Sequence, residues 1–264
     1  MKARVIVLLP VVLVCLGVAP FAGRAASEAS AQAAPVGPVT LGPVAVAPVT
    51  LRPVATDRSV HLQPEAFAST GVPADVLTMA IGAITCAVNT GALDMPPTLT
   101  LIDYSKPSTE PRLWVFDLAT GEMLFEELVA HGKNTGENMA QSFSDTLNSR
   151  QSSLGLFRTA DTYTGSNGYS LRLDGLEPGF NSHARERAIV MHGAPYVSAQ
   201  FVAAQGRIGR SWGCPALRTA IAAKVIDTIR GGGVIFSYYP DSNWLRTSRF
   251  LNGCDTAPAT LATR

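Results

Sequence analysis

The chain has 264 residues, which is enough for one domain with a sizeable core plus additional segments. Its formal net charge of +1 excludes the strongly basic surface of a typical nucleic-acid-binding protein, so we expect no nucleic-acid partner. Charged residues make up only 16% of the chain, a low share for a cytosolic enzyme, partly because both ends are apolar or neutral.

The first 33 residues follow the order of a secretory signal peptide. Lys2 and Arg4 form a basic start, Val5 to Val18 is almost unbroken apolar, and small residues follow up to Ala34. The apolar run is about 14 residues long, whereas a membrane span needs roughly 20. We therefore predict a signal peptide over residues 1–33 and an exported protein in the periplasm or cell envelope. An uncleaved membrane anchor is the alternative.

Residues 34–60 form a Pro/Val-rich linker. Pro-Val pairs recur from Pro35 to Pro53, and each proline removes a backbone donor and fixes its own φ. The composition favours an extended polyproline-like spacer, with a featureless disordered leader as the alternative. A catalytic domain is predicted to follow over residues 61–245, and a C-terminal tail over residues 246–264.

The start of this domain predicts a helix and then strands. Apolar residues at three-to-four spacing predict a helix over residues 73–91. Runs of β-forming residues predict strands at 99–104 and 113–117, and a returning hairpin strand over 123–131. The polar segment 132–153 predicts a long loop, which in a compact domain is often functional.

The second half continues the β pattern. Short apolar runs predict strands at 154–157, 169–173 and 188–191, and a final strand is predicted at 234–239. One apolar face over residues 216–230, ended by three glycines, predicts a second helix. Beyond Pro240 we expect irregular chain, pinned down by Trp244 and Phe250. The whole pattern predicts a mainly antiparallel β core with one or two helices.

The cysteines suggest one disulfide and one free thiol. Cys15 lies in the apolar run of the signal, so the exported protein would keep Cys86, Cys214 and Cys254. An odd count in an oxidising compartment suggests one pair, and we predict Cys86–Cys254 with Cys214 free. Three separate thiols are the alternative. The sequence has no CxxC or HExxH arrangement, so we expect no metal site and no cofactor.

Cys214 and His192 form the candidate catalytic pair. A helix over 216–230 would place the Cys214 sulfur at a helix N-terminus, where the dipole favours the thiolate and free N–H groups could receive an oxyanion. His192 closes an apolar strand, so the sheet would hold its imidazole as a base for the thiol. An inert buried cysteine and a structural histidine are the alternative.

The wider pattern resembles the active-site signature of the L,D-transpeptidases. His192-Gly193 is followed, after seventeen residues, by Ser211-Trp212-Gly213-Cys214. The sequence Ser-Trp-Gly-Cys-Pro-Ala-Leu is similar to that of the murein L,D-transpeptidase catalytic domain family, the YkuD-like L,D-transpeptidases. The resemblance covers roughly residues 65–240, with further likeness at 101–108, 131–136 and 149–157.

The resemblance implies a fold and a reaction. The fold would be mainly β, a sandwich or barrel with one helix before the core and one after the catalytic cysteine. Cys214 would attack the bond between diaminopimelate and the terminal D-alanine of a peptidoglycan stem peptide. His192 would act as base, with the Gly193 carbonyl as the third member. The thioester would pass to a second stem peptide, a lipoprotein amine or water.

The resemblance also assigns the loop before the cysteine. Ser211 matches the serine of the signature, and Gly213 with Cys214 matches the oxyanion region. Trp212 would stack on substrate or pack the loop. His131, which begins a second His-Gly pair, would line the cleft.

One departure concerns recognition of the substrate carboxylate. Better-known members of the family carry Arg or Asn two residues after the cysteine, where this chain has Ala216. Arginine binds carboxylates well, so basic residues elsewhere are possible substitutes. We predict Arg210 and Arg218 as substrate-binding residues, with further candidates at Arg185, Arg187 and Arg207.

Two other functions remain compatible with the sequence. Water as the acceptor would make the protein an L,D-carboxypeptidase, and the sequence does not separate this activity from transfer. A non-catalytic wall-binding module would keep the fold but not the activity, and the presence of both Cys214 and His192 argues against it.

Overall fold

The structure, a computed structural model, describes residues 71–254. The predicted signal peptide and Pro/Val-rich linker lie outside the described residues, as does the chain after Cys254. None of the helices within residues 71–254 has the length and apolar character that crossing a membrane requires.

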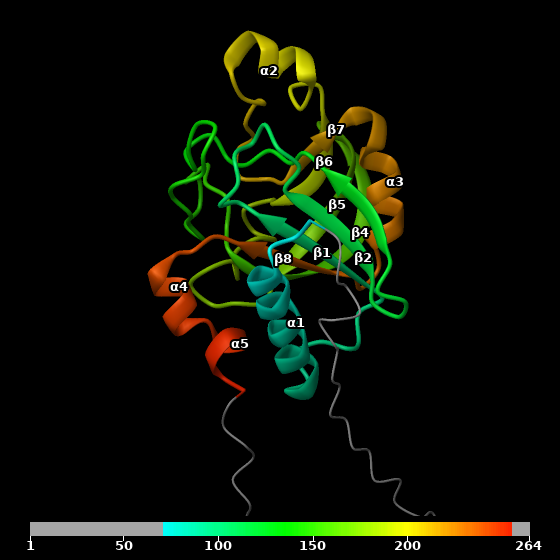
Figure 1. The fold of residues 1–264 in the computed structure, drawn as a ribbon, viewed down its shortest axis with the longest axis vertical. Coiled ribbons are helices and arrows are strands. Elements are labelled where there is room, and N and C mark those ends of the chain that lie inside the picture. The colour runs from blue at the N-terminus through cyan, green and yellow to red at the C-terminus, as the bar shows by residue number, and fades with distance from the viewer. Residues whose placement is uncertain (1–70, 255–264) are drawn as a thin grey trace, which may run out of the picture. The chain divides into compact units, whose positions relative to one another are not determined.

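The described part of the chain is built around one eight-stranded sheet (Figure 1). Its strands are β1 (Thr98–Asp103), β2 (Leu113–Asp117), β3 (Met123–Glu127), β4 (Gly155–Gly165), β5 (Gly168–Gly175), β6 (Val190–Ala194), β7 (Ala216–Arg218) and β8 (Val234–Tyr238). Their order is β3-β2-β1-β8-β4-β5-β6-β7. β1–β8 and β6–β7 are parallel pairs, and the other neighbours are antiparallel. The predicted mainly β fold is confirmed.

The two edges of this sheet nearly meet. The chain continues from β3 to Ala130, which forms an antiparallel bridge with Ala216 of β7. The Ala130 N–H donates to the Ala216 carbonyl at 2.8 Å. This bridge gives the sheet a barrel-like closure, and the seam lies next to the segment that carries Cys214.

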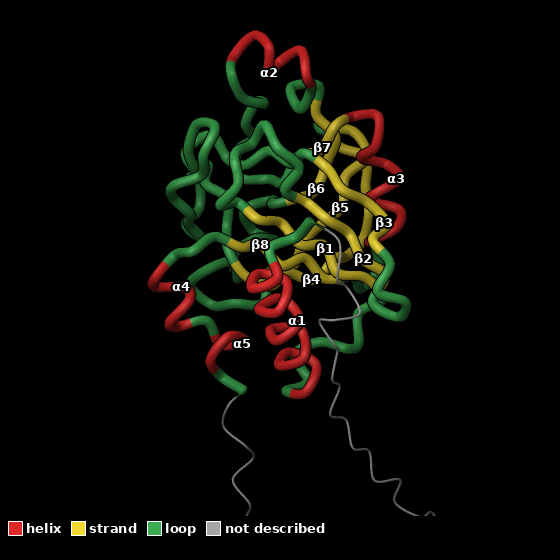
Figure 2. Tube along the Cα trace, viewed as in Figure 1, coloured by secondary structure: helices red, strands yellow, loops and turns green. Residues whose placement is uncertain are grey.

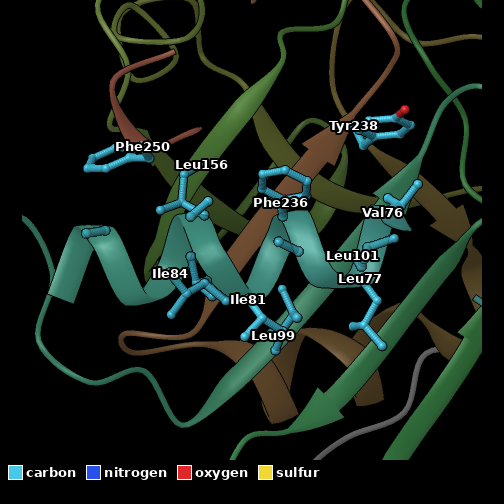
Figure 3. Packing of buried hydrophobic residues seen from close by; sticks show 14 of the residues in the cluster. Val76, Leu77, Ile81, Ile84, Leu99, Leu101, Leu156, Phe236, Tyr238 and Phe250 are labelled. Atoms are coloured by element: carbon cyan, nitrogen blue, oxygen red, sulfur yellow. The ribbon is translucent and has the colours of Figure 1, made fainter. Parts of the chain in front are cut away.

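Two helices cover the sheet. Helix α1 (Ala74–Asn89) packs on one face, as Figure 3 shows for Val76, Leu77, Ile81 and Ile84 lying against Leu99, Leu101, Leu156 and Phe236. Helix α3 (Thr219–Ile229) packs against the strand residues that alternate with those facing α1. Leu113 and Val115 of β2 are among them. Because successive side chains of a strand point to opposite faces, one sheet serves two apolar cores.

Three further helices were not predicted. They are α2 (Ala199–Gln205), α4 (Ser242–Thr247) and α5 (Arg249–Asn252). The expectation of irregular chain beyond Pro240 is therefore wrong, although Trp244 and Phe250 are buried in the α1 core as expected. Helix α2 buries none of its residues and projects from the end of the molecule that carries β6 and β7 (Figure 1). Figure 2 shows most loop segments on the side of the sheet opposite α3.

The predicted helix over 216–230 is also wrong at its start. Residues 216–218 form strand β7, and the helix begins only at Thr219. Pairing of β7 with β6 in register His192↔Ala216 fixes these residues as strand. Tertiary pairing here overrides the helical apolar spacing that includes Leu217.

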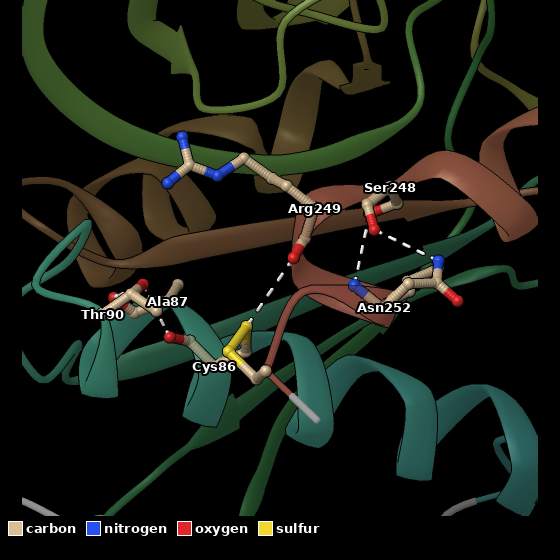
Figure 4. Close-up of a disulfide and its surroundings, with 8 residues drawn as sticks. Cys86, Ala87, Thr90, Ser248, Arg249 and Asn252 are labelled. Atoms are coloured by element: carbon tan, nitrogen blue, oxygen red, sulfur yellow. Dashed lines mark hydrogen bonds between the residues drawn. A yellow bond between two sulfur atoms is a disulfide. The ribbon is translucent and has the colours of Figure 1, made fainter. Parts of the chain in front are cut away.

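A disulfide joins the two ends of the described chain. Cys86 near the end of α1 is bonded to Cys254, which follows α5, and their Cα atoms are 5.5 Å apart. Figure 4 shows the bond beside the Arg249 carbonyl, 3.8 Å from the Cys86 sulfur. Cys214 is the free cysteine among the described residues. The predicted pairing is confirmed.

Candidate active site

The Cys214 sulfur lies in a buried position between backbone groups. The residue is only 8% exposed. The Val190 N–H donates to the sulfur at 3.5 Å, and the thiol donates to the Ala188 carbonyl at 3.7 Å. Ala188 has φ +53°, a left-handed conformation that an alanine rarely adopts, and this turn aims its carbonyl at the thiol.

The thiol is not activated by a helix dipole, contrary to the sequence prediction. Cys214 is separated from α3 by Pro215 and the three residues of β7, and the dipole acts only within the first turn. Burial raises the pKa of Cys214, an effect opposed in part by the Val190 N–H and by the positive charge of Arg187. The resting group is therefore the neutral thiol at neutral pH.

His192 is held on β6 with one nitrogen committed. On β6, His192 pairs with Ser170 of β5 on one side and with Ala216 of β7 on the other. The ring Nδ1 lies 3.0 Å from the Gly193 carbonyl. A carbonyl can only accept, so Nδ1 carries the proton and Nε2 keeps its lone pair. Burial lowers the pKa of His192, partly offset by this hydrogen bond, so the ring is a neutral base.

Cys214 and His192 lie on adjacent segments of the β6–β7 pair, and no hydrogen bond joins their side chains within residues 71–254. The His192 N–H donates to the Pro215 carbonyl at 3.4 Å, which brings its backbone to the residue after Cys214. Within residues 71–254, the hydrogen bonds of the sulfur go to Val190 and Ala188 and not to the imidazole. The expected direct bond is thus not formed here. Catalytic hydrogen bonds are often loose before substrate binds.

The loop before Cys214 is shaped by Ser211. Its hydroxyl accepts from the Gly213 N–H at 3.0 Å and donates to the Cys214 carbonyl at 2.6 Å. Gly213 has φ +126°, and a Cβ there would lie 2.8 Å from the Gln151 carbonyl, so only glycine fits. The Gly213 N–H is thus bonded to Ser211 in this structure. The Cys214 N–H instead faces its own sulfur and helps to lower the pKa of the thiol.

Trp212 projects from this loop. Its side chain is among the few exposed large apolar groups of residues 71–254, with 72% of the residue exposed. The guanidinium of Arg150 lies over the indole ring, 4.6 Å from its centroid. Of the two alternatives predicted for Trp212, packing inside the loop is therefore excluded by its exposure.

The second histidine, His131, is turned away from solvent. Its Nδ1 accepts from Arg112 Nη2 at 2.9 Å, and its Nε2 lies 3.3 Å from the Gly136 carbonyl. Burial, together with the charges of Arg112 and Arg210, lowers the pKa of His131 to about 4. The ring is 1% exposed, so it does not line a cleft. Its backbone carbonyl accepts from the Ser211 N–H at 3.0 Å and so supports the nucleophile loop.

The arginines predicted to bind substrate already have partners. Arg210 donates to Glu137 at 2.7 Å and to the carbonyls of Lys133 and Gly136. Arg218 forms a two-pronged pair with Glu127, at 2.8 Å and 2.5 Å. The Arg218–Glu127 pair borders a cavity of about 610 Å³ near the ends of β6 and β7, which Cys214 and His192 do not line.

The remaining arginine candidates are similarly committed. Arg207 pairs with Glu137, and Arg185 pairs with Asp174. Arg187 is different because its side chain is 3% exposed. It donates to backbone and hydroxyl groups of the long loop, at Ser144, Ser149, Gln151 and Ser153.

Arg187 and the long loop are parts of the site whose roles the sequence did not reveal. Arg187 fastens the segment from Ser144 to Ser153 beside Gly213, and its charge stabilises a Cys214 thiolate. The run of serines in this segment is the sequence signal that could have indicated a hydrogen-bonded loop. Tyr104 also lies close, and burial raises its pKa to about 12, a shift to which Cys214 contributes.

Residues 68–238 match the L,D-transpeptidase catalytic domain family, which is more than half of the chain. This chain belongs to that family. The predicted family is thereby confirmed, and with it an acyltransferase-type catalytic domain related to peptidoglycan. No curated protein matches this chain.

Several solved structures are similar to this chain. An L,D-transpeptidase from Mycobacterium smegmatis is 16% identical, with 54% of this chain and 59% of that chain covered and a TM-score of 0.34. L,D-transpeptidase 1 from Mycobacterium tuberculosis is 16% identical, covering 54% and 62%, with a TM-score of 0.31. One from Stackebrandtia nassauensis is 13% identical, covering 62% and 66%, with a TM-score of 0.34. The chain spans less than two thirds of the length of each.

Proposed function

We propose that the protein is an exported peptidoglycan L,D-transpeptidase that acts on tetrapeptide stems through a thioester at Cys214. The observation that carries this proposal is the free Cys214 thiol two residues before Ala216, the strand partner of His192, whose Nδ1 is engaged by the Gly193 carbonyl so that Nε2 keeps its lone pair. Membership of the L,D-transpeptidase family supports the reaction class. The order of charges and apolar residues over residues 1–33 supports export.

The first half-reaction cleaves the donor. As the sulfur attacks the carbonyl carbon between diaminopimelate and D-alanine, His192 Nε2 takes the thiol proton. The Cys214 N–H donates to the oxyanion as it forms. Collapse of the tetrahedral intermediate expels D-alanine, whose amine takes the proton from His192, and leaves the thioester. The Gly193 carbonyl holds Nδ1–H throughout and stabilises the imidazolium.

The second half-reaction regenerates the thiol. The side-chain amine of a second stem peptide attacks the thioester carbonyl and passes a proton to His192. The sulfur then leaves and recovers that proton, and a cross-linked dimer is released. A lipoprotein amine as acceptor would give a protein–peptidoglycan link, and water would give a tripeptide.

The test is incubation of the purified protein with disaccharide tetrapeptide, followed by mass analysis of the products. We expect cross-linked dimers and free D-alanine from the wild type, none from Cys214→Ala, and a rate about 100-fold to 10,000-fold lower from His192→Gln. His183→Gln is a matched control, because His183 is half exposed and pairs with Asp145, and it should retain the wild-type rate.

The products also separate the alternatives. Tripeptide without dimers would identify a carboxypeptidase. No product, together with no covalent adduct of a carbapenem at Cys214, would contradict both enzymatic activities and leave the wall-binding module.

A further inference from the structure

The substrate carboxylate has no partner at the position where the resemblance implies one. That position is Ala216, which is fully buried at the barrel seam and bridged to Ala130. Arg210 and Arg218, the substitutes predicted from the sequence, are bound to acidic side chains of the chain itself. A cation that recognises the substrate must therefore come from another part of the fold.

Arg150 is a cation beside the nucleophile loop that is not neutralised. It is exposed, and no carboxylate of residues 71–254 forms an ion pair with it. Its guanidinium instead lies over the exposed ring of Trp212, two residues before Cys214. A guanidinium stacked over an aromatic ring keeps the N–H groups along its own edge free, and a carboxylate can bind there in a bidentate manner.

The position of Arg150 is fixed by the loop around it. Arg150 has φ +56°, and its carbonyl accepts from the Asn134 N–H at 3.1 Å. The residues on both sides are anchored by the buried Arg187, which donates to Ser149 Oγ at 3.1 Å and to the Gln151 carbonyl at 2.6 Å. The backbone of Arg150 is therefore held in a left-handed conformation, and its side chain starts from a fixed position.

The same loop sets Arg150 close to the reacting cysteine. A Cβ on Gly132 would lie 2.5 Å from the Arg150 carbonyl and 3.0 Å from Gly213 Cα, so the two backbones flank one glycine. In a stem peptide, the terminal carboxylate is only one residue beyond the carbonyl that Cys214 attacks, a span of about 3.8 Å between Cα atoms. The Arg150 side chain starts from backbone next to Gly213 and is long enough to contact this carboxylate.

We propose that Arg150, supported by Trp212, binds the terminal carboxylate of the donor stem peptide and so selects stems that end in a free acid. This inference rests on the proposed function. It explains how the enzyme recognises its donor without a basic residue at Ala216. It also assigns Trp212 the task of holding the guanidinium flat beside the departing D-alanine.

The test measures discrimination between two donors, the tetrapeptide with a free terminal carboxylate and the same peptide with a terminal amide. We expect the wild type to prefer the acid by about 10-fold to 100-fold in kcat/KM, the range for a hydrogen-bonded charge. Arg150→Met, which keeps the length but not the charge, should lose this preference by slowing the acid and leaving the amide within about twofold. Arg150→Lys should retain part of the preference for the acid, because lysine keeps the positive charge but cannot form the bidentate hydrogen bonds of a guanidinium.

Lys133→Met is the matched control. Lys133 is an exposed cation of the same loop, and its backbone N–H is bonded to the Ser211 carbonyl. Loss of this charge should leave the preference for the acid unchanged, whereas a general electrostatic effect would reduce it as much as Arg150→Met does. Unchanged thermal unfolding of each variant would show that the loop remains folded.

Several outcomes would overturn the inference. They are a wild type that uses acid and amide equally, an Arg150→Met variant that still prefers the acid, and equal losses in Arg150→Met and Lys133→Met. The stem peptide also carries a carboxylate on diaminopimelate. If Arg150→Met instead loses a preference for donors in which that carboxylate is free over donors in which it is amidated, Arg150 binds the diaminopimelate carboxylate and the assignment is contradicted. A wild type inactive on every donor would refute the proposed function, and the inference would fall with it.

Discussion

Burial keeps the Cys214 thiol protonated in the resting protein, and this is the main difference between the site and a thiolate–imidazolium pair. Burial raises the pKa of Cys214 and lowers the pKa of His192, so each group favours its neutral form. The proton then moves only when a substrate carbonyl is in place. Reactivity toward small electrophiles should be low, while reactivity toward a bound peptide is retained.

This difference can be measured by alkylation with iodoacetamide as a function of pH. The thiolate is the reactive form, so the rate for native Cys214 should still be rising above about pH 8.5, where an ordinary thiol is half ionised. The protein unfolded in denaturant, with its disulfide intact, is the control and should follow the ordinary profile. A native rate that levels off below neutral pH would mean a stable thiolate and would contradict this description.

Ser211 should matter for turnover more than for stability. It accepts from the Gly213 N–H and donates to the Cys214 carbonyl, and so fixes the turn that presents the sulfur. Ser211→Ala removes both bonds, and we expect kcat to fall by about 10-fold or more, since each such bond is worth about 1 kcal/mol.

The control for Ser211 is Thr159→Val. Thr159 carries a buried hydroxyl that donates to the Ile229 carbonyl at 2.6 Å. Its loss should lower thermal stability while leaving kcat unchanged. If both variants lose stability and kcat in the same proportion, Ser211 is a packing residue and not a positioning residue.

At the scale of single residues, the sequence predicts the pair of Cys214 and His192 but does not predict the environment of either side chain. The spacing from His192 to Cys214 was enough to select them. The burial of the sulfur depends on contacts with Val190 at the start of β6 and with Ala188 in the turn before it, which are distant from Cys214 in sequence. The ion pairs of Arg210 and Arg218 could not be predicted for the same reason, because Glu137 and Glu127 reach them only in the folded chain.

At the scale of elements, a buried carboxylate connects the C-terminal helices to the sheet. Glu177 is 1% exposed. It accepts from the Leu156 N–H of β4 at 2.8 Å, from Trp244 Nε1 of α4 at 3.1 Å and from the Ser248 hydroxyl. Burial raises its pKa, and these three donors oppose the rise. One side chain thus holds a strand and a helix pair together.

Replacement of Glu177 by glutamine should loosen this connection. A glutamine side chain has one oxygen where the carboxylate has two. Its NH₂ group would therefore face at least one of the three groups that now donate to Glu177. We expect a loss of about 1–3 kcal/mol in the free energy of unfolding, measured by urea denaturation. Glu110→Gln is the control, because Glu110 is exposed, and its stability should match the wild type. Equal stability of the two variants would show that Glu177 makes no net contribution.

Elements were predicted well where one face is apolar over several turns or residues. Helix α1 and strands β1, β2 and β8 all bury such a face, and their predicted positions agree with the structure to within a few residues. Strand β7 is three residues long, too short for any period, and exists because β6 lies beside it. Helix α2 buries nothing, so only its Ser198 cap and left-handed Gly206 could have indicated it.

At the scale of the whole molecule, the disulfide closes a large loop. Cys86 and Cys254 are 168 residues apart in sequence. Cross-linking so long a loop restricts the unfolded chain, a stabilisation of about 2–5 kcal/mol in the usual range for native disulfides. We expect Cys86→Ser/Cys254→Ser to unfold at a lower temperature than the wild type, by calorimetry without reductant.

The reductant provides the matching control. Dithiothreitol should lower the unfolding temperature of the wild type and of Cys214→Ser to the same extent, and should leave the double variant unchanged. An unfolding temperature of the wild type that is insensitive to complete reduction would show that the bond does not stabilise the fold.

The position of the first and last strands has a consequence for the order of folding. β1 is paired in parallel with β8, in register Leu99↔Val234, and β4 completes the sheet on the other side of β8. The centre of the sheet therefore lacks its middle strand until nearly the whole domain has been synthesised, and contacts this distant in sequence form slowly. A nascent chain can make the β1–β2 hairpin but no finished core. For a protein proposed to leave the cytoplasm, this topology means that the central sheet cannot be completed until the chain has been extended to β8.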